Sequence, residues 1–371
     1  MTEKWLFLQN FRWNDAGGAP RVLRTMVRGR EDRVVAVYSG STPPEESATP
    51  TEEIWLPQRR SWGRIERSRF HRIPELFCFI GLSGYTRRLI AFARTSGITG
   101  IHAIAHGNDF IHAHRLSKAL GVPFYMSVHD DIRAVPLGGL RERWMKDAWQ
   151  DAARILAISP ELAEEYGARY GHRSYEVITD GAEILTEVPG IQPEARDLYM
   201  FGSFHLSYED NLRIVARVMA DDGAKVRARV GALRPEFAKE VVDNVTVLPY
   251  VSLSELRSTT ITDLVPTAAL YLPLPFGKDY HWFTRFSLST KLISYLGMGR
   301  PIIYHGPAEA AAAQLLAKHD AAVLVCSNDP LELRAALERC RREGTQLVEN
   351  ALSLAREQFD DAVIRRRFWG S

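Results

Sequence analysis

The sequence predicts an α/β protein of two Rossmann-like, doubly wound domains. The chain has 371 residues, which is enough for two domains of common size, and 46% of them are hydrophobic, which is enough for sizeable cores. Short runs of β-forming residues alternate with helical patterns along the chain, which is the rhythm of parallel βαβ units. A break with Pro and Gly over residues 186–197 separates two such series, so we place the boundary between the domains there.

The first series of elements begins close to the N-terminus. Pro20 begins a helix whose apolar residues share one face, and Pro160 begins another. Residues 39–53 are rich in Ser, Thr, Pro and Glu and have no periodicity, so we expect a solvated loop there. The expected strands of this half are residues 5–8, 34–38, 101–105, 124–128, 155–158 and 175–178.

The second series follows the break and predicts a domain of similar size. Residues 329–343 and 345–369 have the periodicity of two closing helices. The expected strands of this half are residues 198–201, 226–230, 245–248, 270–272, 302–304 and 323–325.

Composition excludes several classes of protein. The three cysteines form no C-x-x-C pair, so they predict neither a disulfide framework nor a structural zinc site, and a reducing compartment fits them best. The apolar run at residues 5–8 is too short for a signal peptide or a membrane span, and no later run reaches about 18 apolar residues. A formal charge of +2 argues against a nucleic-acid-binding surface over the whole molecule. We expect a cytoplasmic protein that binds no nucleic acid.

Three motifs occur in the order found in one enzyme family. Residues 289–303 (STKLISYLGMGRPII) join a helix to a strand through Gly-x-Pro, residues 153–160 (ARILAISP) precede residues 177–182 (VITDGA), and residues 121–124 (GVPF) lead to His129. In this order the chain resembles the glycosyltransferases of GT-B architecture over most of its length. The likeness is to the retaining glycosyltransferase group 1 family, which includes bacterial mannosyl- and glucosyltransferases.

The resemblance implies two Rossmann-like domains that face a cleft. Residues 1–186 would bind the acceptor, residues 187–350 would bind the nucleotide-sugar, and a C-terminal helix in residues 351–371 would pack back on the first domain. The implied activity is transfer of a hexose from a nucleotide-sugar donor to a glycan or lipid-linked acceptor, with retention of configuration. No metal ion or other cofactor is implied, because the nucleotide-sugar is a substrate.

The chain departs from the family at its acidic positions. The family has two Glu residues eight positions apart, and here these positions are Phe286 and Ser294. The family's Arg and Lys after the first strand of the second domain are also absent, since residues 204–207 (FHLS) follow Gly202 and Ser203. A divergent branch is implied, and inversion of configuration stays open. Two other functions also stay open: a nucleotide-sugar 2-epimerase of the same architecture, and an inactive nucleotide-binding or scaffold homologue.

Two glycine turns are candidates for contact with the donor. Gly17 and Gly18 follow the first expected strand, where backbone amides can approach a diphosphate at the positive end of a helix. The alternative is a tight turn that needs a positive φ. The segment is not G-x-G-x-x-G, which argues against a nicotinamide or flavin dehydrogenase. Gly202 and Ser203 occupy the corresponding turn of the second domain, with the same two interpretations.

Ser289, Thr290 and Lys291 begin an apolar helix and are candidates for the donor's phosphates. Amides, hydroxyls and an ammonium there would compensate the charge of a leaving nucleoside diphosphate. The alternative is an ordinary N-cap followed by a solvated lysine. Arg234 or Arg285 could supply the guanidinium that the family places elsewhere, and either could equally be a surface residue.

His129 follows an expected strand at the carboxyl edge, where ligands bind in open α/β sheets. Its imidazole suits a hydrogen bond to a sugar hydroxyl or to the oxygen that is transferred, and the alternative is a satisfied histidine that caps the strand. Asp130, Asp131 and Asp15 are candidates for a general base, which an inverting enzyme needs, or are loop carboxylates.

Four histidines close together in the sequence suggest a metal site, but their spacing argues against it. His112 and His114 are two residues apart in an expected helix and so face different ways, and no cysteine accompanies them or the nearby His102 and His106. We expect no metal.

An arginine-rich stretch, residues 59–94, has the strongest local charge asymmetry in the chain. Only Glu66 and Glu75 oppose its arginines, and aromatic residues lie among them. This composition suits a peripheral surface on anionic lipid, into which we expect Phe77, Phe79 and Ile80 to insert. The alternatives are a solvated face, or a nucleic-acid groove for which no recognition fold is present. The arginines are Arg59, Arg60, Arg64, Arg67, Arg69, Arg72, Arg87, Arg88 and Arg94.

Overall fold

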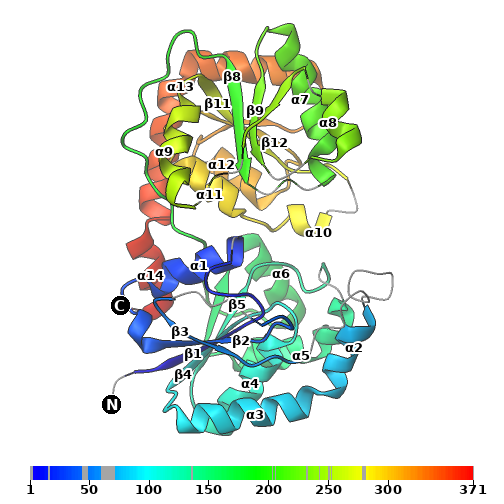
Figure 1. The fold of residues 1–371 in the computed structure, drawn as a ribbon, viewed down its shortest axis with the longest axis vertical. Coiled ribbons are helices and arrows are strands. Elements are labelled where there is room, and N and C mark those ends of the chain that lie inside the picture. The colour runs from blue at the N-terminus through cyan, green and yellow to red at the C-terminus, as the bar shows by residue number, and fades with distance from the viewer. Residues whose placement is uncertain are drawn as a thin grey trace. The chain divides into compact units, whose positions relative to one another are not determined.

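The computed structural model describes residues 3–15, 17–43, 49–59, 72–134, 137–202, 204, 206–230, 233–241, 243–249, 251, 253–277 and 281–370. The chain folds into two compact units (Figure 1). The first unit contains the residues up to Asp180 together with those from Ile364 onward, and the second is Gly181–Val363. The chain therefore leaves the first unit shortly before residue 186, where the sequence places the boundary, and returns to it at Ile364.

The first unit is built on a parallel sheet of seven strands, in the order β3-β2-β1-β4-β5-β6-β7. The order reverses between β1 and β4, and ligands of open α/β sheets bind at the carboxyl ends of the strands beside such a reversal. The elements are β1 (Trp5–Gln9), α1 (Gly18–Val27), η1 (Glu31–Arg33), β2 (Val34–Tyr38), β3 (Glu52–Trp55), α2 (Arg72–Ile80), α3 (Leu82–Thr95), β4 (Gly100–Ile104), α4 (Asp109–Leu120), β5 (Phe124–Val128), α5 (Gly138–Asp151), β6 (Arg154–Ala157), α6 (Pro160–Tyr170), β7 (Tyr175–Val177) and, at the end of the chain, α14 (Asp361–Trp369).

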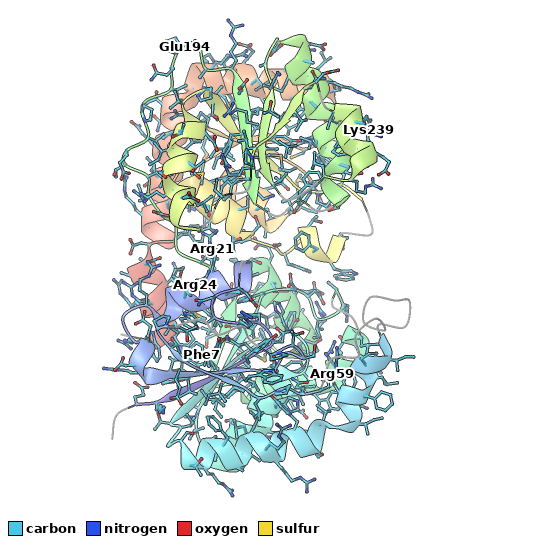
Figure 2. The ribbon with its side chains drawn as sticks, in the orientation of Figure 1. Phe7, Arg21, Arg24, Arg59, Glu194 and Lys239 are labelled. Atoms are coloured by element: carbon cyan, nitrogen blue, oxygen red, sulfur yellow. The ribbon has the colours of Figure 1, made fainter. Side chains whose placement is uncertain are left out.

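One hydrophobic cluster of the first unit lies between its sheet and the helices α1 and α14. Trp5 and Phe7 pack there against Phe368 of α14, with ring centroids 6.2 and 5.6 Å from its ring. Phe7 is labelled in Figure 2. The indole Nε1 of Trp369 donates a hydrogen bond of 2.8 Å to the carbonyl of Met26 in α1. The last residues of the chain therefore complete the core of the first unit.

The second unit is built on a parallel sheet of six strands, in the order β10-β9-β8-β11-β12-β13, which reverses between β8 and β11. Its core packs Met200 and Tyr271 from the sheet against Leu337 and Leu347 of α13. The elements are β8 (Asp197–Gly202), η3 (Leu206–Tyr208), α7 (Glu209–Asp221), β9 (Val226–Val230), α8 (Pro235–Val241), β10 (Val245–Val247), α9 (Leu253–Leu264), β11 (Thr267–Pro273), α10 (His281–Thr284), α11 (Thr290–Leu296), β12 (Ile302–His305), α12 (Ala311–Lys318), β13 (Val323–Val325) and α13 (Pro330–Gln358).

The predicted fold class is confirmed: both units alternate parallel strands with helices. All twelve expected strands are present, and β2, β5, β9 and β13 have the expected bounds. Within the described part of the chain, no helix combines the length and the apolar character that crossing a membrane requires.

Two sequence expectations are wrong. The strand β3 begins at Glu52, inside the segment expected to be a loop, and it forms the exposed edge of the first sheet. Helix α13 continues through residue 344, where a break between two helices was expected, and ends at Gln358. A Cβ at Gly344 would lie 3.2 Å from side-chain atoms of Ile191 and Pro301. This glycine therefore permits close packing inside a continuous helix and does not end it.

Candidate active site

Two histidines and a carboxylate meet at the carboxyl edge of the first sheet. His106 follows β4 and His129 follows β5, and these two strands are neighbours. The imidazole rings are perpendicular, with centroids 5.7 Å apart. The Nε2 of His106 lies 3.0 Å from Oδ2 of Asp130, within hydrogen-bond distance. The structure thus places the predicted His129 and Asp130 beside a third residue, His106.

His129 is a buried, neutral histidine. Its Nε2 has no hydrogen-bond partner among the described residues. Burial, with a smaller contribution from His106, lowers the pKa of His129 to about 3, so the imidazole is uncharged at neutral pH. The Nε2 of a neutral imidazole donates or accepts one hydrogen bond, depending on the tautomer. A hydroxyl of a bound ligand would supply the partner that this nitrogen lacks.

Asp130 keeps its negative charge although it lies close to the buried histidine. Burial is the largest influence and acts to raise the pKa of Asp130, but the hydrogen bond and charge of His106, with His129, outweigh it and the pKa is lowered. Its side chain is 32% exposed. The edge of the sheet therefore carries an ionised carboxylate within reach of solvent, next to a neutral imidazole with one free hydrogen-bonding position.

Gln9 is a further polar side chain at this edge, and it ends β1. It is 2% exposed, and neither atom of its amide has a partner among the described residues. Trp5 packs on Tyr125 of β5 with ring centroids 4.5 Å apart, so side-chain alternation along β1 and β5 places Gln9 and His129 on the same face of the sheet. Sequence reasoning missed Gln9 and considered His106 only as a metal ligand. Their positions at or just after strand ends were the available signal.

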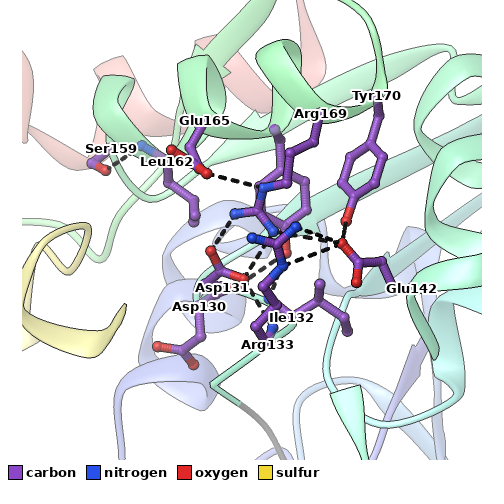
Figure 3. Close-up of polar contacts among 11 residues, drawn as sticks. Asp130, Asp131, Ile132, Arg133, Glu142, Ser159, Leu162, Glu165, Arg169 and Tyr170 are labelled. Carbon is purple, nitrogen blue, oxygen red and sulfur yellow. Dashed lines mark hydrogen bonds and ion pairs between the residues drawn. The ribbon is translucent and has the colours of Figure 1, made fainter. Parts of the chain in front are cut away.

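Two other candidate carboxylates have local partners. Asp131 is fully buried in an ion pair with Arg169, while Figure 3 shows the Asp130 side chain pointing away from that network. The Oδ1 of Asp131 also accepts hydrogen bonds from Arg169 Nη1 at 3.1 Å and from the backbone of Arg133 at 2.8 Å. The carboxylate of Asp15 accepts a hydrogen bond of 2.8 Å from the backbone of Arg12 and is 42% exposed. Asp131 stabilises the loop after β5, and Asp15 stabilises the turn after β1.

The glycines of the first turn lie at the start of α1. Gly17 precedes the helix with a φ of 139°, a conformation that favours glycine, and Gly18 is the first residue of the helix. Further along α1, Arg21 lies 2.8 Å from the buried carboxylate of Asp180, the last residue of the first unit before the crossing. The turn is therefore a tight βα connection, as the structural interpretation of the sequence expected, and the phosphate interpretation stays a prediction.

In the second unit, Gly202 and Lys291 lie together at the carboxyl end of β8. Gly202 has a φ of 103°, and a Cβ on it would lie 3.4 Å from Cε of Lys291. The ammonium of Lys291 lies 4.9 Å from the centroid of the Tyr208 ring. Burial lowers the pKa of Lys291 to about 8. A phosphate bound here would favour the charged form of the lysine, because an opposite charge nearby stabilises the ammonium.

The neighbours of Lys291 in the sequence belong to the start of α11. The hydroxyl of Ser289 accepts a hydrogen bond of 3.2 Å from the backbone of Leu292, so Ser289 is the N-cap of the helix. Thr290 is the first helical residue. Ser203, the remaining candidate of this group, lies outside the described residues.

The two candidate arginines of the second unit contact other side chains. Arg234 forms an ion pair with Glu209, a buried carboxylate at the start of α7, and its Nε donates to Oε1 at 2.7 Å. The guanidinium of Arg285 lies 4.9 Å from the centroid of the Phe286 ring. Phe286 itself is buried, and the hydroxyl of Ser294 donates to the carbonyl of Thr290 at 3.0 Å. The two positions that are acidic in the family thus serve packing and a helix hydrogen bond here.

The other three histidines that the sequence groups with His106 do not converge on one point. The described residues contain no group of three or more His, Cys, Asp or Glu side chains that could hold a metal ion. The three side chains have separate partners, His102 with Ser127, His112 with Thr86, and His114 with Asp151.

Comparison with known proteins gives a family match and a shared fold. The model of Glycosyltransferase Family 4 matches residues 16–183. No curated protein sequence matches the chain. The structure of HepE from Anabaena, solved in complex with UDP and glucose, is 14% identical, with a TM-score of 0.67 over 98% of each chain.

Two further solved structures are similar over nearly the whole chain. A glycosyltransferase from Rickettsia africae is 11% identical, with a TM-score of 0.64 over 99% of this chain and 96% of its own. An alpha,alpha-trehalose-phosphate synthase (UDP-forming) from Burkholderia vietnamiensis is 12% identical, with a TM-score of 0.63 over 99% of each chain. At these identities the likeness concerns the fold.

Proposed function

From the GT-B fold and the family match over residues 16–183, we propose that the chain is a glycosyltransferase that transfers a hexose from a nucleotide-sugar donor to a glycan or lipid-linked acceptor. One observation carries the proposal: the neutral His129, whose Nε2 lacks a partner, lies beside the ionised Asp130 at the carboxyl edge of the first sheet. These groups suit hydroxyl-rich ligands. An imidazole hydrogen-bonds a hydroxyl without charge, and a carboxylate accepts a proton from one.

The donor side of the proposal rests on Lys291 and Gly202. A nucleoside diphosphate that leaves the sugar carries negative charge, and fixed positive charge lowers the free energy of that step. Lys291 supplies a partly buried ammonium, and the missing side chain of Gly202 leaves room for it. The structures of HepE in complex with UDP and with UDP-glucose support a nucleotide-sugar as the donor class. We propose that no metal ion takes part and that the configuration of the sugar is retained.

The acceptor side rests on the first unit, to which the family match belongs. His129 would hold a hydroxyl of the reacting sugar, and Asp130 would keep His106 oriented through its hydrogen bond. For a lipid-linked acceptor, the proposal includes a peripheral position on the cytoplasmic face of a membrane.

The test is a turnover assay with a panel of UDP-, GDP- and ADP-hexoses, each with and without glycan or polyprenyl-phosphate-linked acceptors. We expect acceptor-dependent release of one nucleoside diphosphate and a glycosylated product by mass spectrometry, with the anomeric configuration read by NMR. Release of free 2-epimer without an acceptor would replace transfer with epimerisation. Nucleotide binding without any turnover across the panel would overturn the proposal in favour of an inactive homologue.

A matched pair of variants connects the activity to the donor residues. Lys291→Ala should lose turnover, whereas Lys239→Ala should keep it. Lys239 is an exposed lysine of α8 in the same unit (Figure 2). This control therefore removes a lysine charge of the same unit that does not lie beside Gly202.

A further inference from the structure

Helix α2 carries an apolar stripe that faces away from the first unit. Its four side chains are spaced at i, i+3, i+4 and i+7, which places them on one face of a helix. The stripe consists of Ile73, Leu76, Phe77 and Ile80, exposed by 42, 49, 49 and 75%. Apolar side chains that are exposed singly are common, but a contiguous group on one short helix marks a surface for interaction.

The flank of α2 beside the stripe is fixed to the body of the unit. The ring of Phe79 stacks on the ring of Trp144 in α5, with centroids 5.6 Å apart and an interplanar angle of 12°. The guanidinium of Arg141 lies 5.5 Å from the centroid of Phe79. The sequence expected Phe79 to belong to the exposed group, and the structure corrects this, because Phe79 is the anchor of the helix. The stripe therefore cannot turn inward without breaking the contact with Trp144.

A neighbouring residue of α5 adds to the apolar surface. Leu140 lies one helical turn before Trp144, on the same face of α5, and is 44% exposed. The apolar surface thus extends past the stacked rings of Phe79 and Trp144.

The sequence that contains the stripe has an excess of positive charge. Residues 72–95 contain four arginines and one acidic residue, Glu75. Arg87 and Arg94 of α3 are exposed. The arginines of residues 60–71 belong to the same stretch in the sequence and lie outside the described residues. A cationic surface with large apolar side chains complements a bilayer whose headgroups are anionic and whose interface accepts apolar groups.

We propose that the α2 stripe docks the first unit on an anionic lipid bilayer, with its apolar side chains at the level of the headgroups and the arginines on the lipid phosphates. The arginines favour a lipid bilayer over an apolar protein partner, because an anionic bilayer offers dense negative charge beside an apolar interior. The link to a lipid-linked acceptor rests on the proposed function, whereas the docking is measured without turnover.

The experiment is flotation of the full chain with vesicles of phosphatidylcholine alone or mixed with phosphatidylglycerol, in low and high salt. We expect binding to the mixed vesicles that salt weakens but does not abolish, because salt screens the arginines and leaves apolar insertion intact. Equal binding to both kinds of vesicle, or to neither, would overturn the proposal.

Two variants and a control locate the surface. Leu76→Ser/Phe77→Ser/Ile80→Ser should lose at least tenfold in vesicle affinity, and Arg87→Glu/Arg94→Glu should lose the dependence on phosphatidylglycerol. The control is Leu331→Ser, which removes a 70% exposed leucine from α13 in the second unit and should bind as the wild type does. Wild-type affinity of the stripe variant would contradict the docking.

A second measurement separates this proposal from the proposed function. The affinity of the stripe variant for nucleoside diphosphate, measured by calorimetry, should equal that of the wild type. Failure of flotation with intact turnover would remove only the docking, and vesicle binding without turnover on any donor would remove only the proposed function. Unfolding curves for each variant confirm that the exposed substitutions leave the fold intact.

Discussion

The imidazoles of His106 and His129 stand perpendicular to each other at the ends of neighbouring strands, with centroids 5.7 Å apart. The outer ring is joined to the Asp130 carboxylate, and the inner ring is neutral with an unpartnered Nε2. The two histidines thus differ in role, because one is hydrogen-bonded to the carboxylate and the other offers a hydrogen bond to a ligand.

The first prediction concerns His129. His129→Ala should reduce turnover by more than about tenfold and leave the affinity for nucleoside diphosphate within a few-fold, because the ring is assigned to the sugar. The acid limb of the pH–rate profile should not reflect His129, whose pKa of about 3 lies far below the assay range. His114→Ala is the matched control, since His114 pairs with Asp151 away from this edge. Equal loss of affinity and rate would make His129 a structural residue.

The second prediction concerns Lys291. Lys291→Ala should weaken binding of nucleoside diphosphate by roughly 1.5–3 kcal/mol, the range of a hydrogen bond to a charged group. In the wild type, affinity should also fall as pH rises through about 8, because the ammonium loses its proton there. Titration calorimetry between pH 7 and 9 measures both effects. A variant with unchanged affinity, or one that keeps the pH dependence, would remove Lys291 from the donor site.

The third prediction concerns Asp109, a buried residue that begins α4. It accepts hydrogen bonds from Ser39 Oγ at 3.1 Å and Gln58 Nε2 at 2.7 Å, but burial raises its pKa to about 7. Between pH 4 and 7 the folded state therefore holds a proton that the unfolded state has lost, so the free energy of unfolding falls as pH rises.

Asp109→Asn should remove this dependence, which amounts to roughly 2–3 kcal/mol between pH 5 and 8. Urea unfolding of both proteins at the two pH values gives the difference, and titration of the buried histidines cancels because both proteins contain them. Parallel pH dependence of the two proteins would show that Asp109 ionises normally in the folded state.

The fourth prediction concerns Gln9, whose amide is buried without partners among the described residues. Gln9→Met keeps most of the volume and removes the unpaired amide, so the free energy of unfolding should rise by about 1 kcal/mol. Urea denaturation in the absence of substrate measures this change. A loss of stability instead would mean that the amide is hydrogen-bonded to water in the folded protein.

Sequence reasoning placed the strands well because their signal is local. The run Val34–Tyr38 contains three valines and a tyrosine, which favour strands, and its bounds were predicted to the residue. The strand β3 was missed because it begins with Glu52 and Glu53 at the edge of the sheet, where no buried face imposes a pattern. The residue Gly344 was misread because its role depends on Ile191 and Pro301, which lie far away in the sequence.

The candidate site was predicted only in part, because contacts between residues far apart in the sequence leave no local pattern. A histidine directly after a strand can be found from the sequence, as His129 was. The partnership of His106 with Asp130 joins loops after two different strands, so only the folded sheet reveals it. Likewise, periodicity identifies the apolar side chains of α2, but the contact with Trp144 decides that Phe79 faces inward and Ile73 outward.

The return of α14 to the first unit determines when during synthesis the core of that unit can form. The rings of Phe368 and Trp369 pack against Trp5, and the indole of Trp369 donates a hydrogen bond to α1, yet both residues are synthesised after the whole second unit. The strands of the seven-stranded sheet are synthesised first. The core that packs against α14 can be completed only after the whole second unit has been synthesised. A nascent or truncated chain that ends before residue 364 exposes that unfinished core, so we expect quality control to act on it even when every strand of both sheets is present.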